Sequence, residues 1–154
     1  MAEWSNNAEQ EINPGESVIF TENPVPCNRG LVRHRDGTGN FLLAGVTNGC
    51  ACVKSANYLV DFGANIAIPT GGTVGEISLA ITIDGATIPS SQMIVTPAAV
   101  EEYFNVTSTA IITVPRGCCF NVSLRNVPAS EDPTVTPAPV INLQNGNLII
   151  NRIA

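Results

Sequence analysis

Strict alternation of apolar and polar residues between positions 58 and 84 limits this chain to a narrow set of folds. In the first half the apolar residues occupy every second position: Tyr58, Val60, Phe62, Ala64, Ile66 and Ile68. In the second half they recur at Ile77, Leu79, Ile81 and Ile83. Successive side chains of a β-strand point to opposite faces, so a period of two is typical of half-buried strands. We therefore predict a pair of long strands, joined at Pro69–Thr73, whose shared apolar face lies in a core.

The rest of the chain repeats this pattern. Alternation over Cys118–Arg125 predicts a further strand, which would form a hairpin with Thr109–Val114 around residues 115–117. Three dipeptides favour tight turns between strands: Asp36-Gly37, Asp84-Gly85 and Asn145-Gly146. Counting these segments gives about eight to ten strands, so we predict an all-β chain folded as an antiparallel β-sandwich. At 154 residues, one domain is the default.

Composition and charge exclude several classes of function. Charged residues make up only 13% of the chain, the formal net charge is -6, and Lys54 is the single lysine. Such a chain has no basic footprint for nucleic acid and no cationic face for anionic lipid. No apolar run approaches the ~20 residues of a membrane helix, and the N-terminus has no secretory signal pattern. We expect neither nucleic acid nor membrane as a partner.

The N-terminal segment contains the only tryptophan. Residues 1–13 are otherwise polar and acidic, and Trp4 has no apolar neighbour in sequence. We interpret residues 1–13 as an arm and residues 14–154 as the folded domain. Trp4 would then be an anchor inserted into a partner; the alternative is a disordered tail.

Candidate chemical groups are few. The chain has no G-x-S-x-G, no H-E-x-x-H and no phosphate-binding glycine loop, and His34 has no partner histidine, so we predict no catalytic residue, no metal ligand and no cofactor. The cluster of Arg29, Arg33, His34 and Arg35 is better explained as the solvated face of a strand than as an anion contact. Thr96–Phe104 is the only helical signal, and its Glu101 and Glu102 do not form an acid/base pair because adjacent helical residues do not face each other.

The five cysteines do not form a convincing disulfide framework. Their number is odd and Cys118 and Cys119 are adjacent, so we expect mostly free thiols. Zinc bound by Cys50, Cys52 and this pair is an alternative, but adjacent residues on a strand point to opposite faces. We expect Cys118 to pack as a small apolar residue beside Phe120.

Four segments together resemble a known family. They are Ala56–Ala64, Ile83–Ile88, Val114–Gly117 and Asn147–Ile153. The succession is similar to the C1q/TNF-like jelly roll, especially to the bacterial and phage versions found in phage structural proteins and at the tips of spore-surface collagen-like proteins. The resemblance implies a jelly roll of about ten strands over residues 14–154 that assembles as a homotrimer around a three-fold axis. The chain departs from the spore-surface form because it has no Gly-X-Y stalk.

Three non-enzymatic functions are compatible with these features. The first is a phage virion protein, a homotrimeric capsid decoration or fibre-head module assembled in the bacterial cytoplasm, whose N-terminal arm docks on the major capsid protein or another virion protein. The second is a trimer at a spore or cell surface. The third is a carbohydrate-binding module, although the only Trp and Tyr residues are Trp4, Tyr58 and Tyr103. For the trimer interface we nominate the small residues opposite the apolar faces of the first two strands: Gly63, Ala67, Ser78 and Ala80.

Overall fold

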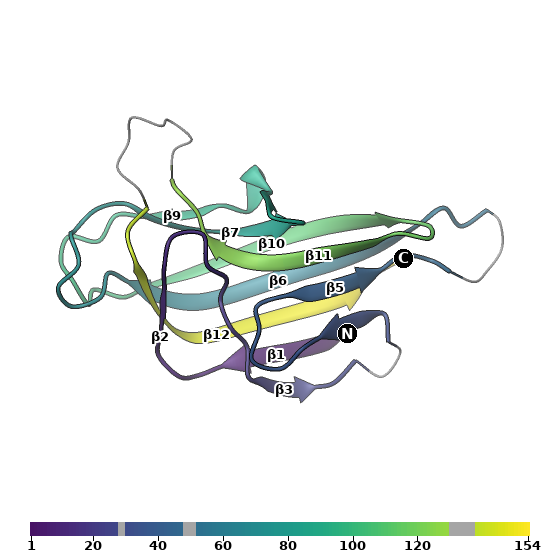
Figure 1. Cartoon of the computed structure of the whole chain (residues 1–154), viewed down its shortest axis with the longest axis horizontal. Helices are drawn as coiled ribbons and strands as arrows, with labels where there is room; N and C mark the ends of the chain where they lie inside the picture. The colour runs from purple at the N-terminus through teal and green to yellow at the C-terminus, as the bar shows by residue number, and fades with distance from the viewer. Residues whose placement is uncertain (28–29, 48–51, 130–137) are drawn as a thin grey trace.

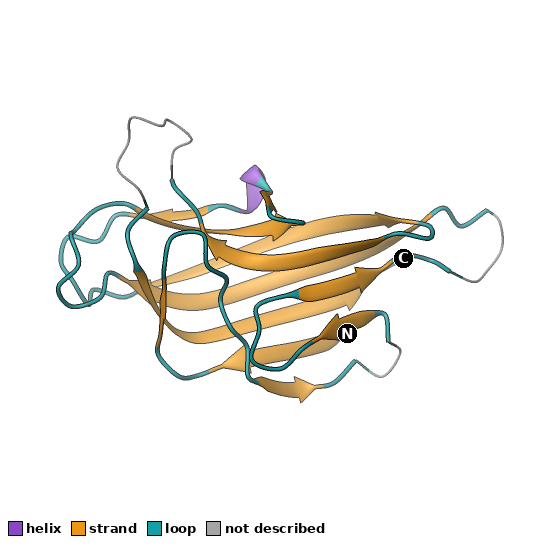
Figure 2. Ribbon diagram, in the orientation of Figure 1, coloured by secondary structure: helices purple, strands orange, loops and turns teal. Residues whose placement is uncertain are grey.

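The structure is a computed structural model that describes residues 1–27, 30–47, 52–129 and 138–154. Its strands form two antiparallel sheets that pack face to face as a sandwich (Figures 1 and 2). Sheet A has the order β10 (Phe104–Pro115), β6 (Ser55–Ala67), β12 (Ile141–Arg152), β1 (Ala2–Asn6) and β3 (Glu22–Val25), and β2 (Gln10–Ile12) also pairs with β12. Sheet B has the order β4 (Val32–His34), β5 (Phe41–Ala44), β11 (Cys119–Asn126), β7 (Ile77–Ile83) and β8 (Ala86–Thr87), and β9 (Met93–Val95) also pairs with β7. The predicted all-β sandwich is confirmed.

The alternating segment 58–68 supplies the centre of the core. All six of its apolar side chains are at most 2% exposed, and they face the apolar residues of β7 and β11 across the sandwich. The largest fully buried side chains are aromatic: Tyr58, Phe20, Phe41 and Phe62. Burial of apolar surface stabilises a fold by about 25 cal/mol per Å², so this layer is the main source of stability.

The predicted pairing of the first two long strands is wrong. β6 already has β10 on one side and β12 on the other, so neither of its edges is available to β7. β7 lies instead in sheet B, between β11 on one side and β8 and β9 on the other. Residues 68–76 carry the chain from one sheet to the other, beginning with a turn in which the Gly72 N–H donates to the Pro69 carbonyl at 2.9 Å. Alternation specifies which face of a strand is buried, but it does not specify which strand lies next to it.

The predicted hairpin between residues 109–114 and 118–125 is wrong for the same reason. β10 belongs to sheet A and β11 to sheet B, so the turn at residues 115–118 connects the two layers. Two other hairpins are confirmed. β4 pairs with β5, and β7 pairs with β8 through a turn in which Asp84 and Gly85 have φ angles of 49° and 88°.

Two local predictions near the end of the chain are corrected. Asn145-Gly146 is not a hairpin turn: β12 runs through it, with a register shift between Gln144 and Asn147 and a φ of 54° at Asn145, which mark a β-bulge. Residues 96–103 form turns rather than a helix. Glu102 caps this segment, because its Oε2 accepts the backbone N–H groups of Ala98 at 2.7 Å and Ala99 at 3.2 Å.

The proposed N-terminal arm is part of the sandwich. β1 lies between β12 and β3, and β2 pairs with β12, so residues 2–12 supply two strands of sheet A. The first and last strands are neighbours, with Ala2 opposite Ile150, and both chain ends lie at the same end of the molecule (Figure 1). Among the described residues, no helix has the length and apolar character needed to cross a membrane.

Candidate interaction face

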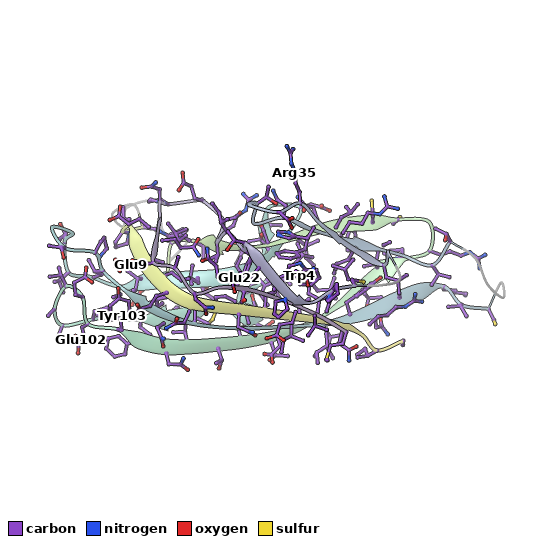
Figure 3. All side chains as sticks on the ribbon, turned by 90° about the horizontal axis from the view of Figure 1, so that it is seen from below. Trp4, Glu9, Glu22, Arg35, Glu102 and Tyr103 are labelled. Carbon is purple, nitrogen blue, oxygen red and sulfur yellow. The ribbon has the colours of Figure 1, made fainter. Side chains whose placement is uncertain are left out.

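Trp4 is a core residue. It is only 2% exposed, and its ring packs edge-on against Phe41 at 4.9 Å between centroids and against His34 at 5.8 Å. Figure 3 places it within the body of the sandwich. The expectation that Trp4 anchors the chain to a partner is therefore wrong. In the structure Ala2, Trp4 and Asn6 are buried and alternate with half-buried neighbours, as in a β-strand. The sequence offered only a weak sign of this strand, because its five residues contain a single large apolar side chain.

His34 acts as part of the same aromatic cluster. Its ring stacks on Phe41 at 4.2 Å, Nδ1 lies 3.1 Å from the Asn40 carbonyl oxygen, and Nε2 lies 3.3 Å from the Phe20 carbonyl oxygen. Both nitrogens therefore face backbone acceptors. Arg33 and Arg35 are exposed, and Arg35 projects away from the ribbon in Figure 3, while Arg29 lies outside the described residues.

Three of the four nominated interface residues are covered within the chain itself. Ala67 and Ala80 are 0% exposed and Ser78 is 1% exposed, so the nomination of these three is wrong. Gln92 explains the burial of Ser78, because its Nε2 donates to Ser78 Oγ at 2.9 Å. Only Gly63 retains exposure, on the side of β6 that faces away from the core.

The outward side of sheet A is the larger accessible surface that contains Gly63. The interaction face consists of the outward residues of β6, β10 and β12 at the centre of this surface: Leu59, Asp61, Gly63, Thr109, Ile111, Asn147 and Ile149. The strand register places Ile111 opposite Leu59, and Thr109, Asp61 and Ile149 in one row. Asp61 is the only charge in this set, and it accepts a hydrogen bond from Thr109 Oγ1 at 2.7 Å. Ile111 is 64% exposed, so the centre of the face presents an apolar side chain among uncharged groups.

The edge of sheet A next to this face has no charge. β10 is the last strand of sheet A, it contains twelve residues without a single Asp, Glu, Lys or Arg, and it pairs with β6 in unbroken register. Long edge strands of monomeric proteins are usually protected by charges, prolines or bulges. Within the described part of the chain β10 has Pro115 at its last position and no bulge, and the nearby β9 adds the 47% exposed Ile94. This edge has the character of a surface that another chain covers.

The two tyrosines, candidate ligand contacts from the sequence, form hydrogen bonds within the chain. Tyr58 is fully buried, and its hydroxyl donates to the Ala44 carbonyl at 2.5 Å with the Leu31 carbonyl at 3.2 Å. Burial raises the pKa of Tyr58, and nearby Arg152 partly opposes this. Burial and the carboxylates of Glu101 and Glu9 raise the pKa of Tyr103.

Three of the described thiols lie at the surface. Cys52, Cys118 and Cys119 are exposed free cysteines, so the expectation that Cys118 packs in an apolar setting is wrong. Cys50 lies outside the described residues. Across the described ranges, no group of three or more His, Cys, Asp or Glu side chains is arranged to hold a metal ion.

One large cavity, of about 710 Å³, lies at an end of the sandwich. It is bordered by residues 68–76 and by residues 128–129 and 138–140, and the charged residues in the described part of its lining are Glu11 and Glu76. Among the residues that the structure describes, the lining contains Gly, Pro and Val but no aromatic side chain. Aromatic side chains and a few polar groups usually supply the contacts in ligand pockets, and here the aromatic part is missing.

Comparison with known proteins identifies the fold. No protein-family model and no curated protein matches the sequence. Among solved structures, the globular domain of zebrafish complement 1qA is similar with a TM-score of 0.52 and 15% sequence identity, covering 94% of this chain and 93% of that one. An isomalto-dextranase of Arthrobacter globiformis T6 in complex with panose aligns with a TM-score of 0.32 and 14% identity, over 95% of this chain and 22% of that one, which is too low to carry an argument. The fold is thus the C1q/TNF-like jelly roll that the sequence resemblance implies.

Proposed function

We propose that this protein is a non-enzymatic structural module that assembles as a homotrimer. The observation that carries the proposal is the uncharged edge strand β10 beside the interaction face. Both surfaces expose apolar side chains, and a second copy could cover them without removing charges other than Asp61 from water. Because an edge and a face are different patches, their contact is heterologous, and repeated contacts of this kind form a ring when the rotation between copies closes. A ring of three is what the C1q/TNF-like resemblance implies.

A charge placed at the centre of the interaction face tests the assembly. We expect the wild-type protein to have three times the 16.1 kDa chain mass by size-exclusion chromatography with light scattering. Ile111→Lys would bury an unpaired ammonium in the contact, at a cost of several kcal/mol, and should shift the protein to single chains. Circular dichroism should show that the variant keeps its fold, because Ile111 is 64% exposed within the chain.

Ile19→Lys is the matched control. Ile19 is also an exposed isoleucine, at 41%, but it lies in the segment that forms bridges with sheet B and not on the interaction face. This variant should keep the wild-type mass. Wild-type protein that remains a single chain at all concentrations would overturn the trimer. Loss of assembly in both variants would show that the interaction face is not the specific contact between copies.

For its biological setting we propose a phage virion, with the module as a capsid decoration or fibre head. Support comes from the resemblance to phage versions of the fold and from the exposed free thiols, which suit assembly in a reducing compartment. Because Trp4 is buried, it is not available to dock an N-terminal arm on a partner, so contact with a capsid protein would use another surface. The alternatives remain a cell- or spore-surface trimer and a glycan-binding module.

The genes next to this one distinguish these settings. Capsid or tail genes would support the virion role, whereas genes for spore-coat or exported surface proteins would contradict it. A glycan array with the assembled protein tests the third function. Specific glycan binding that is lost when the 710 Å³ cavity is blocked would favour the carbohydrate-binding module over a purely structural role.

A further inference from the structure

The cavity at the end of the sandwich is built from segments that are distant in sequence. One wall is the connection between β6 and β7, residues 68–76, and the remaining described walls are Glu11 of β2, residues 128–129 after β11 and residues 138–140 before β12. The β6–β7 connection and β2 lie at the same end of the molecule in Figure 1. A volume of about 710 Å³ is within the range of pockets that bind small organic molecules. The cavity can therefore hold an extended organic ligand.

Hydrogen bonds between segments hold the walls of this cavity in position. The Ile68 carbonyl accepts the Glu101 N–H at 2.8 Å, which fixes the start of the β6–β7 connection. On another wall, Asn126 Nδ2 donates to the Ile12 carbonyl at 2.9 Å and to the Pro139 carbonyl at 2.7 Å. Asn126 is fully buried, so it joins β2 to the chain before β12 from inside the core. A cavity whose walls are already ordered loses less entropy when a ligand binds.

Two carboxylates of the cavity have no partner within the described part of the chain. Most described carboxylates accept a hydrogen bond, as Asp61 does from Thr109 at 2.7 Å. Glu11, Asp36 and Glu76 accept none from the described residues, and Glu11 and Glu76 both line the cavity. The described lining contains no Lys, Arg or His that could neutralise them. A ligand with positive charge would supply the partners that the described chain does not.

The rest of the described lining favours an aliphatic ligand. Ile68, Val74 and Val140 supply branched apolar side chains beside prolines and alanines. No described lining residue is aromatic, so a cation–π contact is not available and recognition of charge depends on the two carboxylates. Across the described ranges, no group of three or more His, Cys, Asp or Glu side chains could hold a metal ion here. These features suit ammonium groups carried on a chain of methylenes.

We propose that this cavity binds an aliphatic polyamine, with ammonium groups paired to Glu11 and Glu76 and methylenes packed on the apolar lining. Hydrogen bonds between ammonium and carboxylate are stronger than neutral ones, and burial of each methylene adds to the affinity. Because both carboxylates are exposed, the expected dissociation constant is only about 10⁻⁴–10⁻³ M. The cavity shares no described residue with the interaction face, so the site does not depend on the trimer.

Isothermal titration calorimetry of the full chain with spermidine tests the site. We expect saturable binding that weakens as salt is added, together with a rise in Tm with spermidine. Butylamine has a single ammonium group and can pair with only one carboxylate at a time, so it should bind about tenfold or more weakly than spermidine. Absence of saturable binding and of the rise in Tm in the wild type would overturn the proposal. Butylamine that binds as tightly as spermidine would also overturn it.

Three variants locate the binding. Glu11→Gln and Glu76→Gln should each weaken spermidine binding about tenfold, and both should keep the wild-type Tm without ligand because neither carboxylate has a partner among the described residues. Asp36→Asn is the matched control, because Asp36 is an exposed carboxylate that also lacks a described partner, and it lies between β4 and β5 outside the described cavity lining. It should bind as the wild type does. Equal losses in all three variants would overturn the proposal, since spermidine would then be a counterion for the net charge of -6.

Discussion

At the scale of single residues, the core polar group of most consequence is the Tyr58 hydroxyl. From its place in sheet A it reaches into sheet B, to the carbonyl oxygens of Leu31, which precedes β4, and of Ala44, the last residue of β5. The Leu31 carbonyl already accepts the Ala44 N–H at 2.9 Å, so the hydroxyl matters most as a donor to the Ala44 carbonyl. Alternation in the sequence predicted that Tyr58 is buried, but the partner of its hydroxyl depends on the opposite sheet.

Removing this hydroxyl should weaken the fold and change its response to alkali. Tyr58→Phe leaves the Ala44 carbonyl oxygen without this donor, at an expected cost of about 1–3 kcal/mol in the free energy of unfolding. Burial raises the pKa of Tyr58 above 10.0, so the folded state holds the phenol proton more tightly than the unfolded state. The resulting stability is present below about pH 10 and is lost as the pH rises through the folded-state pKa. Urea unfolding from pH 7 to 11 should show a steeper alkaline loss in the wild type than in Tyr58→Phe; equal slopes would contradict this role.

At the scale of elements, close contacts between connections hold the two sheets in place. Gly45 follows β5 and donates its N–H to the Cys118 carbonyl at 2.8 Å, while the Gly117 N–H donates to the Val46 carbonyl at 3.1 Å. The end of β5 is therefore joined to the turn between β10 and β11. A Cβ on Gly45 would overlap the Pro115 carbonyl oxygen and come within 2.9 Å of the Cys118 carbonyl oxygen, both of them backbone atoms.

Gly45→Ala should therefore be strongly destabilising. The backbone of either connection would have to move, and we expect a loss of about 1–3 kcal/mol or more in chemical denaturation, as for overpacked cores. Gly75→Ala is the control, since a Cβ there has no heavy atom within 4 Å and Gly75 is not among the positive-φ glycines. It should unfold within about 0.5 kcal/mol of the wild type. A mild effect of Gly45→Ala would show that the turn at residues 115–118 is not held by this approach.

At the scale of the whole molecule, the chain closes on itself through its two ends. β12 lies between β6 and β1, so the last strand and the first complete sheet A together. Trp4 enters the core beside Phe41 of sheet B, and the N-terminal segment thereby contributes to both layers. Residues 1–13 are for this reason an integral part of the sandwich and not an appendage.

Deleting residues 1–13 should abolish cooperative folding. The deletion removes β1 and β2, exposes the edge of β12 and opens the core where Trp4 was, so we expect loss of the thermal transition in circular dichroism. Trp4→Ala alone should lower the free energy of unfolding by about 3–5 kcal/mol. Ile19, which is 41% exposed, is the comparison. Ile19→Ala should change the free energy of unfolding by about 0.5 kcal/mol or less. A truncated chain that unfolds like the wild type would restore the arm interpretation.

The sequence by itself determined that the chain is an all-β sandwich and which face of each long strand enters the core. It did so because alternation depends only on the geometry of a single strand, as the complete burial of the apolar residues from Tyr58 to Ile68 shows. Only the tertiary structure decided the strand neighbours, the burial of Trp4, Ala67, Ser78 and Ala80, and the meeting of Glu9 with Asn142. Those features depend on which elements pack together across long stretches of sequence, and a period of two does not encode a partner.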